Sequence, residues 1–132
     1  MSGVVFDAYS VIAYIEREPG YEHVEACLER AARAAEPILF CVVNWGEVYY
    51  SILREAGHRK AEEAKQVIET LPIEIIMVDL LLTQQAAIYK ASYKMSYADC
   101  FAAALAKFRH ATLMTGDKEF RQVEGDVKIA WL

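Results

Sequence analysis

Short runs of consecutive hydrophobic residues alternate along the chain with longer segments in which hydrophobic residues recur every three or four positions. The short runs lack the polar alternation of a strand with one exposed face, so we expect strands that are buried on both faces. They predict five strands, at Val4–Phe6, Ile38–Val42, Ile73–Val78, Thr112–Met114 and Val127–Ala130. The pattern therefore predicts an α/β domain with three layers, αβα, in which helices cover both faces of a parallel sheet.

The periodic segments predict the helices, and glycine or proline marks several of the ends. The expected helices are Tyr9–Glu16, Tyr21–Ala35, Asn44–Ala56, His58–Thr70, Asp79–Tyr93, Ser96–Arg109 and the short Lys118–Val123. Pro37, Gly57 and Pro72 separate neighbouring elements. The sequence has no internal repeat or long linker, and its 132 residues suit one domain spanning residues 1–132.

Composition excludes several classes of protein. With 55% hydrophobic and 25% charged residues the chain is globular, and its net charge of −5 argues against a protein that coats nucleic acid by bulk positive charge. No apolar run is long enough to span a membrane, and we expect no secretory signal and a cytoplasmic location. Cys27, Cys41 and Cys100 lie in apolar contexts without a C-x-x-C pair, so we expect buried, reduced thiols.

Four of the 19 acidic residues stand out by their position in the predicted fold. Asp7 directly follows the first strand, and Asp117 follows the fourth strand after a short turn. Glu47 and Asp99 each lie in the first turn of a predicted helix. Because ligands of open parallel sheets bind at the carboxyl ends of the strands, we expect these four carboxylates to meet at one edge of the sheet.

Each of these acids also has a structural explanation. Asp7 and Asp117 are suited to cap the helix that follows them. Glu47 and Asp99 each follow a potential N-cap residue by three positions, as in a capping box, where the acid accepts a hydrogen bond from the backbone at the helix start. Considered one at a time, the position of Asp7 favours a functional role over capping. The position of Asp117 favours neither role, and the positions of Glu47 and Asp99 favour capping.

A cluster of four carboxylates needs positive charge. At a separation of about 4–5 Å and an effective dielectric constant near 20, each ionised pair repels by about 3–4 kcal/mol. Several such pairs would match the whole stability of a domain, about 5–15 kcal/mol. Oxygen ligands without neighbouring histidine or cysteine suit Mg²⁺ or Mn²⁺ rather than zinc. Such cations can orient a phosphodiester, activate water and stabilise the leaving oxygen, so the sequence predicts a hard-metal site.

The segments around the four acids also carry a family resemblance. They are Val4–Tyr9, Asn44–Val48, Ser96–Ala106 and Leu113–Phe120. In this order they resemble the motifs of the PIN domain, and the most similar group is the VapC toxins of type II toxin–antitoxin systems. The resemblance covers essentially the whole chain and implies a PIN-like fold with a five-stranded parallel sheet.

The resemblance implies a Mg²⁺- or Mn²⁺-dependent endoribonuclease that hydrolyses RNA phosphodiester bonds with metal-activated water, as the toxin of a VapBC-type system. It implies that Asp7, Glu47, Asp99 and Asp117 are the catalytic metal ligands and that Thr115 supplies a supporting hydroxyl near the metal. It also implies a homodimer and inhibition by a VapB-type antitoxin, which inserts a segment at the active site.

Two positions depart from the family pattern. Tyr9 stands where relatives often have Ser or Thr, and Glu119, which we expect to be exposed, stands where many have Asp. The main alternative to a nuclease is a non-catalytic PIN-fold binding module, which would not need all four acids. A phosphatase-type enzyme with Asp7 as nucleophile would call for a second acid at position 9. Basic residues expected near the acidic edge, as candidates for phosphate contacts, are Lys90, Lys94, Lys118 and Arg121.

Overall fold

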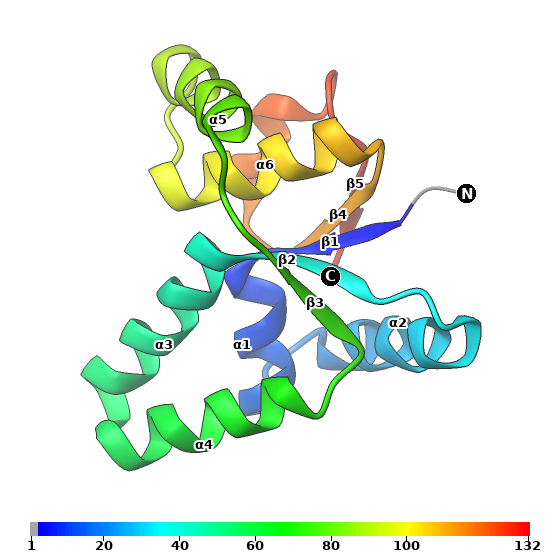
Figure 1. The fold of residues 1–132 in the computed structure, drawn as a ribbon, viewed down its shortest axis with the longest axis vertical. Coiled ribbons are helices and arrows are strands. Elements are labelled where there is room, and N and C mark those ends of the chain that lie inside the picture. Colours follow the sequence, from blue (N-terminus) through cyan, green and yellow to red (C-terminus); the bar gives the residue numbers. More distant parts are fainter. Residues whose placement is uncertain (1–2) are drawn as a thin grey trace.

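Five parallel strands form the middle layer of the computed structural model, which describes residues 3–132 (Figure 1). The strands are β1 (Val4–Phe6), β2 (Ile38–Cys41), β3 (Ile73–Ile76), β4 (Thr112–Thr115) and β5 (Ile129–Trp131). Their order across the sheet is β3-β2-β1-β4-β5, so β1 lies at the centre. Phe6 of β1 aligns with Phe40 of β2 and with Met114 of β4. The five-stranded parallel sheet is confirmed.

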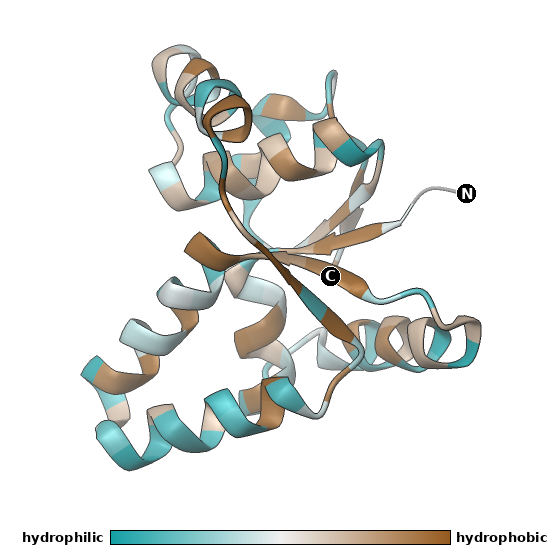
Figure 2. Ribbon diagram, viewed as in Figure 1, coloured by the Kyte–Doolittle hydropathy of each residue, from teal (hydrophilic) through white to brown (hydrophobic). Residues whose placement is uncertain are grey.

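Helices cover both faces of this sheet, and the three-layer arrangement is confirmed. One face carries α1 (Ala8–Glu16), α2 (Tyr21–Ala34), α3 (Val42–Ala56) and α4 (His58–Glu69). The other face carries α5 (Leu80–Ser92), α6 (Tyr97–Arg109) and the 3₁₀ helix η1 (Lys118–Val123). The strands are largely hydrophobic along their length (Figure 2), as a sheet covered on both faces requires.

The sheet divides the core into two clusters. Val5 and Leu39 pack toward α5 and α6, whereas Phe6 and Phe40 pack toward the helices of the other layer. This assignment follows from the alternation of side chains along a strand. All three cysteines are buried and free, as predicted; they are Cys27, Cys41 and Cys100.

Several element bounds differ from prediction by one or two residues. Strand β3 ends at Ile76 because its pairing with β2 stops at the Cys41–Ile76 pair, where β2 turns into α3. Helix α3 therefore begins at Val42, two residues before the predicted start. It ends at Gly57, whose φ of 91° lies in the left-handed region that favours glycine, as expected for a C-terminal cap.

Helix α6 is buried from Asp99 to Ala106. Its small side chains, mostly alanine, allow it to lie against β1, β2 and β4 and against α3 and α5. This close packing fixes the first turn of α6 at the carboxyl edge of the sheet, which is where Asp99 enters the candidate site.

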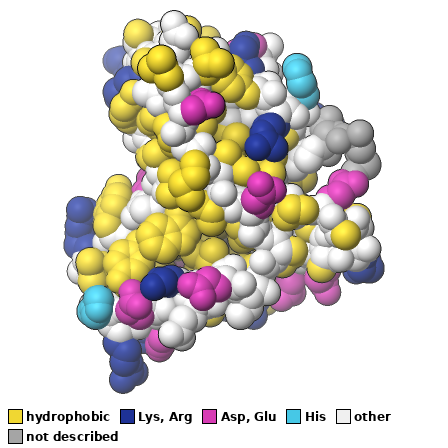
Figure 3. Space-filling model, viewed as in Figure 1, with side chains coloured by type: hydrophobic (Ala, Val, Ile, Leu, Met, Phe, Trp, Pro, Cys, Tyr) yellow, Lys and Arg dark blue, Asp and Glu magenta, His cyan; other side chains and the backbone are white. Residues whose placement is uncertain are grey.

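The surface carries hydrophobic side chains on two helical faces. In the view of Figure 3 they gather over α5 and over α3 and α4. On α5 and the segment before it the exposed ones are Met77, Leu80, Leu81 and Ile88, and on α3 and α4 they are Tyr50, Leu53 and Val67. No helix within residues 3–132 combines the length and hydrophobicity needed to cross a bilayer. Exposed apolar faces of this kind suit contacts with other protein chains.

Candidate active site

The structure brings the four predicted acids to the carboxyl edge of the sheet, around the central strands. Asp7 lies between β1 and α1, and Asp117 lies between β4 and η1. Glu47 lies on α3 and Asp99 in the first turn of α6. Glu47, Asp99 and Asp117 line one open cavity of about 330 Å³. Asp7 is only 1% exposed, and its charge acts on the neighbouring Asp99.

Both oxygens of Asp7 are held by hydrogen bonds. Oδ1 accepts from the backbone N–H of Ser10 at 3.0 Å, which makes Asp7 the N-cap of α1. Oδ2 accepts from the hydroxyl of Thr115 at 2.5 Å. The Thr115 hydroxyl in turn accepts from the backbone N–H of Asp117 at 3.0 Å. Thr115 therefore joins two of the four acids and sets their relative position.

Asp117 also has a capping role. Its Oδ1 accepts from the backbone N–H of Glu119 at 2.9 Å, so it is the N-cap of η1. Glu119 is exposed, as predicted, and it lines the same cavity. Nearby, the Ser10 hydroxyl donates to the carbonyl of Met114 at 2.6 Å and ties the start of α1 to β4. Asp7 and Asp117 are thus anchored by both their side chains and their backbone.

Glu47 is not part of a capping box, so that alternative is wrong. The N-cap of α3 is Cys41, which places Asn44 inside the first turn and Glu47 in the second. The Asn44 side chain is fully buried and its Nδ2 donates to the Ala98 carbonyl at 3.0 Å and to Glu47 Oε1 at 3.4 Å. Asn44 therefore connects the helix that carries Glu47 with the first turn of α6, next to Asp99.

Asp99 forms only half of its predicted capping box. Ser96 is the N-cap of α6, and its hydroxyl accepts from the backbone N–H of Asp99 at 3.1 Å. Within residues 3–132 no hydrogen bond returns from the backbone at the helix start to the Asp99 carboxylate. The carboxylate therefore remains free to act in the cavity that it lines.

The electrostatics of the site disfavour a full set of negative charges. Burial raises the pKa of Asp7 to about 7, against the lowering effect of its hydrogen bonds to Thr115 and Ser10. Burial, together with repulsion from Asp7, Asp117 and Glu47, raises the pKa of Asp99 to about 8. Burial also raises the pKa of Glu47, which its hydrogen bond from Asn44 opposes. The cluster thus retains protons unless positive charge enters.

The comparison with protein families agrees with this architecture. A model of the PIN domain matches residues 4–126. The chain belongs to the PIN domain family. A search of curated protein sequences found no significant match.

Solved structures with the fold of this PIN domain come from several bacteria. A VapBC2 complex of Rickettsia felis bound to promoter DNA contains a chain with 16% identity and a TM-score of 0.78, with 98% of each chain covered. A DNA-bound VapBC complex of Salmonella typhimurium gives 17% identity, a TM-score of 0.74 and 98% coverage of each chain. VapC20 of Mycobacterium tuberculosis is a toxin that cleaves the sarcin–ricin loop. It gives 17% identity and a TM-score of 0.71, with 92% of this chain and 95% of the VapC20 chain covered. At these identities the likeness is one of fold.

The donor atoms of this PIN domain suit a hard divalent cation. Oxygen is the only donor type among the four acids, and two of the four have pKa values raised to about 7 and about 8. The buried Asn44 Oδ1 also has no hydrogen-bond partner within the described chain, so the polar surroundings of the site are incomplete. Among residues 3–132, no three His, Cys, Asp or Glu side chains are already arranged to hold a metal ion. The metal-ligand role of the acids stays a prediction.

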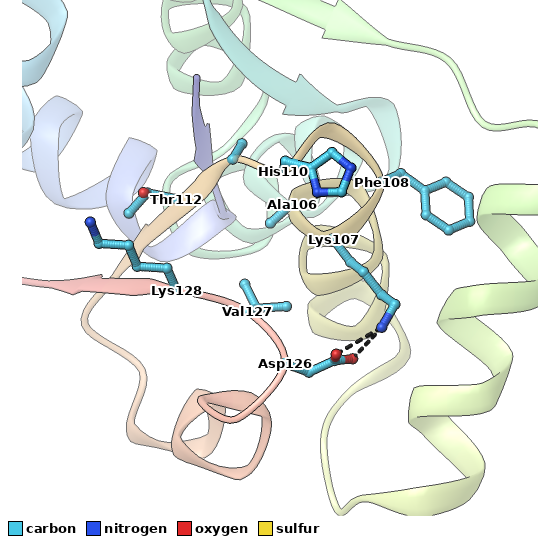
Figure 4. A pocket seen from close by; sticks show the side chains of 9 residues that line it. Ala106, Lys107, Phe108, His110, Thr112, Asp126, Val127 and Lys128 are labelled. Atoms are coloured by element: carbon cyan, nitrogen blue, oxygen red, sulfur yellow. Dashed lines mark hydrogen bonds and ion pairs between the residues drawn. The ribbon is translucent and has the colours of Figure 1, made fainter. Parts of the chain in front are cut away.

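A larger cavity of about 940 Å³ lies at the opposite, amino edge of the sheet (Figure 4). It is lined by the end of α6, the start of β4 and the segment before β5. Its single acidic side chain, Asp126, is neutralised by Lys107, whose Nζ lies 2.7 Å from both carboxylate oxygens. Because it contains none of the four acids, we place the candidate active site of the PIN domain in the smaller cavity.

Two residues that support the acids were not anticipated from the sequence. Ser10 was not singled out, although it lies three positions after Asp7, where an N-cap makes its bond. The sequence pattern suggests only a capping role for Asn44. Its partner Ala98 lies 54 positions away in the sequence, so the contact leaves no local signal. Among the basic candidates, the Lys90 ammonium donates a hydrogen bond to the carbonyl of Met95, whereas Lys118 is exposed.

Proposed function

We propose that this PIN domain is a divalent-metal-dependent endoribonuclease, the toxin of a VapBC-type toxin–antitoxin system acting in the cytoplasm, with Mg²⁺ or Mn²⁺ as its cation. The observation that carries the proposal is the meeting of Glu47, Asp99 and Asp117 on one cavity with Asp7 buried beside them. The raised pKa values of Asp7 and Asp99 support it, because a divalent cation replaces the protons that these carboxyl groups retain.

Different residues of the chain would have different roles at such a site. When bound, a hard divalent cation supplies Lewis acidity toward a phosphodiester and lowers the pKa of a coordinated water. Asp7 and Asp117 would hold the cation with little movement of their own, because hydrogen bonds with Thr115 and with the helix starts that they cap fix both carboxylates. Glu47 and Asp99 would complete the oxygen ligands from α3 and α6, with Asn44 orienting Glu47. No side chain has to serve as a nucleophile.

The arrangement of Asp7 argues against the phosphatase-type alternative. Asp7 is 1% exposed, so a group as large as a phosphate has poor access for attack by either carboxylate oxygen. Position 9, where that chemistry would want a second acid, carries a tyrosine. A non-catalytic binding module remains the second candidate and is separated from the nuclease by the experiment below.

The fold relatives supply the substrate class and the partners of the proposal. VapC20 of Mycobacterium tuberculosis cleaves the sarcin–ricin loop, which supports RNA as the substrate here. The VapBC complexes support a VapB-type antitoxin as a partner. That this antitoxin inserts a segment at the active site is the part of the proposal that follows from the family resemblance. For the homodimer we propose a contact through α5, whose exposed face carries Leu80, Leu81 and Ile88 and whose sequence contains no acid.

The decisive experiment is cleavage of a defined RNA pool with Mg²⁺ or Mn²⁺ by the wild type and by Asp99→Asn. Asp99 is the best position because its carboxylate caps no helix and Asn keeps its shape. We expect cleavage that EDTA abolishes and that the substitution lowers by orders of magnitude, while the variant stays folded. Equal activity in the variant would refute the four-acid mechanism. Inactive wild type that still binds an antitoxin would favour the binding module.

A further inference from the structure

An aromatic side chain lies at the wall of the candidate active site and has no role in holding the acids. Tyr9 belongs to the first turn of α1, two residues after Asp7, and it lines the same cavity as Glu47, Asp99 and Asp117. Its side chain is 45% exposed, although the residues on either side of it are buried. Within residues 3–132 its hydroxyl forms no hydrogen bond that would explain its position.

The ring of Tyr9 lies directly beside Gly116, in the space that a side chain at position 116 would occupy. A Cβ atom added to Gly116 would lie 2.3 Å from Cε1 and 2.7 Å from Cζ of Tyr9, distances that no real side chain tolerates. The absence of a side chain at Gly116 therefore leaves room for the ring, and Gly116 is not among the glycines with a positive φ. Gly116 lies between Thr115 and Asp117, so the ring lies next to the turn that carries two residues of the site.

The cavity offers space and surface for more than a cation. Its volume of about 330 Å³ reaches the lower range of small-molecule pockets, about 300–1,000 Å³. Its lining also has two kinds of surface. Helix α1 contributes the apolar Ala8, Tyr9 and Ile12, whereas α3, α6 and the turn after β4 contribute the acids.

We propose that Tyr9 forms a subsite that stacks against a nucleobase next to the phosphate that is cut. The inference rests on the proposed function and adds the part of the substrate that the acids do not recognise. Aromatic side chains bind single-stranded RNA by stacking on its bases, whatever the sequence. This chain has a net charge of −5, so it lacks the bulk positive charge with which other proteins hold phosphates. An exposed ring beside the acids supplies affinity that does not depend on charge.

Binding measurements in the inactive Asp99→Asn background test the subsite without cleavage. The ligands are a single-stranded RNA oligonucleotide and copies with an abasic nucleotide at each position in turn, all with Mn²⁺ present. We expect Tyr9→Ala to raise the Kd for the intact oligonucleotide by about 5- to 150-fold, the usual loss for one stacked base. We expect Tyr9→Phe to bind like its parent, because stacking needs the ring and not the hydroxyl.

The abasic series decides where the ring acts. With Tyr9 present, one abasic position should weaken binding by a factor similar to that of Tyr9→Ala, and in the Tyr9→Ala protein the same position should have little further effect. Gly116→Ala, which displaces the ring, should behave like Tyr9→Ala. Mn²⁺ binding by calorimetry should stay the same in the Tyr9 variants, which separates lost stacking from a damaged metal site.

The proposal is overturned if Tyr9→Ala binds the intact oligonucleotide as tightly as its parent does. It is equally overturned if every abasic position weakens both proteins by the same factor, because the effects of ring and base would then be independent. The proposed function fails by a different result, namely the absence of metal-dependent cleavage by the wild type. The binding cycle decides the role of Tyr9 in either case.

Discussion

Removing the charge of Asp99 should stabilise the metal-free protein, although it abolishes the proposed activity. Asp99 is 8% exposed, and its pKa is raised to about 8 by burial and by the neighbouring acids. In the unfolded chain the group titrates near 3.8. Between these two values the folded protein retains a proton that the unfolded chain has released. The free energy of unfolding therefore falls as the pH rises from about 4 to about 8 and is level above that.

The size of the effect follows from the shift. At about 1.4 kcal/mol for each pKa unit, a shift from 3.8 to about 8 corresponds to an upper limit of roughly 6 kcal/mol. Because the cavity is open, water reduces both the desolvation and the repulsion, and we expect Asp99 to contribute a loss of about 2–4 kcal/mol between pH 5 and pH 8. An amide at this position carries no charge at any pH, so Asp99→Asn should lack this contribution and keep only the loss due to other acids, chiefly Asp7, whose pKa burial raises to about 7.

Urea denaturation in EDTA at pH values from 5 to 9 measures both curves. The wild type should approach or fall below the stability of Asp99→Asn as the pH rises, and the gap between the two should change in favour of the variant by about 2–4 kcal/mol. Adding Mn²⁺ at pH 8 should restore the stability of the wild type and have a smaller effect on the variant. Parallel curves for the two proteins in EDTA would refute the electrostatic reasoning.

Three further predictions concern two residues that contact the acids and one residue at the larger cavity. Asn44→Ala should weaken Mn²⁺ binding, measured by calorimetry, by about 10- to 100-fold. The control is Ile52→Ala, a core change on the same helix, which should lower the melting temperature and leave the Mn²⁺ affinity unchanged. Equal Mn²⁺ affinities in the two variants would contradict the positioning role of Asn44. Thr115→Val should destabilise the protein by about 1–3 kcal/mol in urea and reduce RNA cleavage, because Asp7 loses its hydroxyl donor, and Thr115→Ser should retain both. Lys107→Met, which breaks the exposed pair with Asp126, should change stability by less than about 1 kcal/mol and leave RNA cleavage unaltered; a large loss of activity would show that the larger cavity takes part.

The fold could be predicted from the sequence because its local signals agree with one another. Strand β1 and the helix η1 were predicted with their observed bounds, Val4–Phe6 and Lys118–Val123. The start of α3 was missed because Val42 and Val43 are β-branched residues that favour strands, and no side chain caps the helix there. The pairing of β2 with β3 ends at the Cys41–Ile76 pair, and a local sequence pattern does not contain the limit of that pairing.

The candidate site could be predicted to the extent that topology alone places it. Asp7 and Asp117 follow parallel strands that are neighbours in the sheet, so both must lie at the same edge. The role of Asn44 depends on a partner in another helix and left no local signal, which is why the capping box with Glu47 was a reasonable but wrong reading of that spacing. The position of Tyr9 against Gly116 depends in the same way on a contact between distant segments.

Capping and metal binding are often treated as competing roles for a carboxylate, but the geometry of Asp7 lets one group serve both. Oδ1 is used by the helix cap, whereas Oδ2 accepts a single hydrogen bond from Thr115 and retains a lone pair. Asp7 would therefore bind a cation through one oxygen, in an orientation that the fold has already fixed. Asp99, whose carboxylate caps nothing, has no such constraint. A site that combines anchored and free acids can hold a cation firmly on one side and adapt on the other as a phosphate enters.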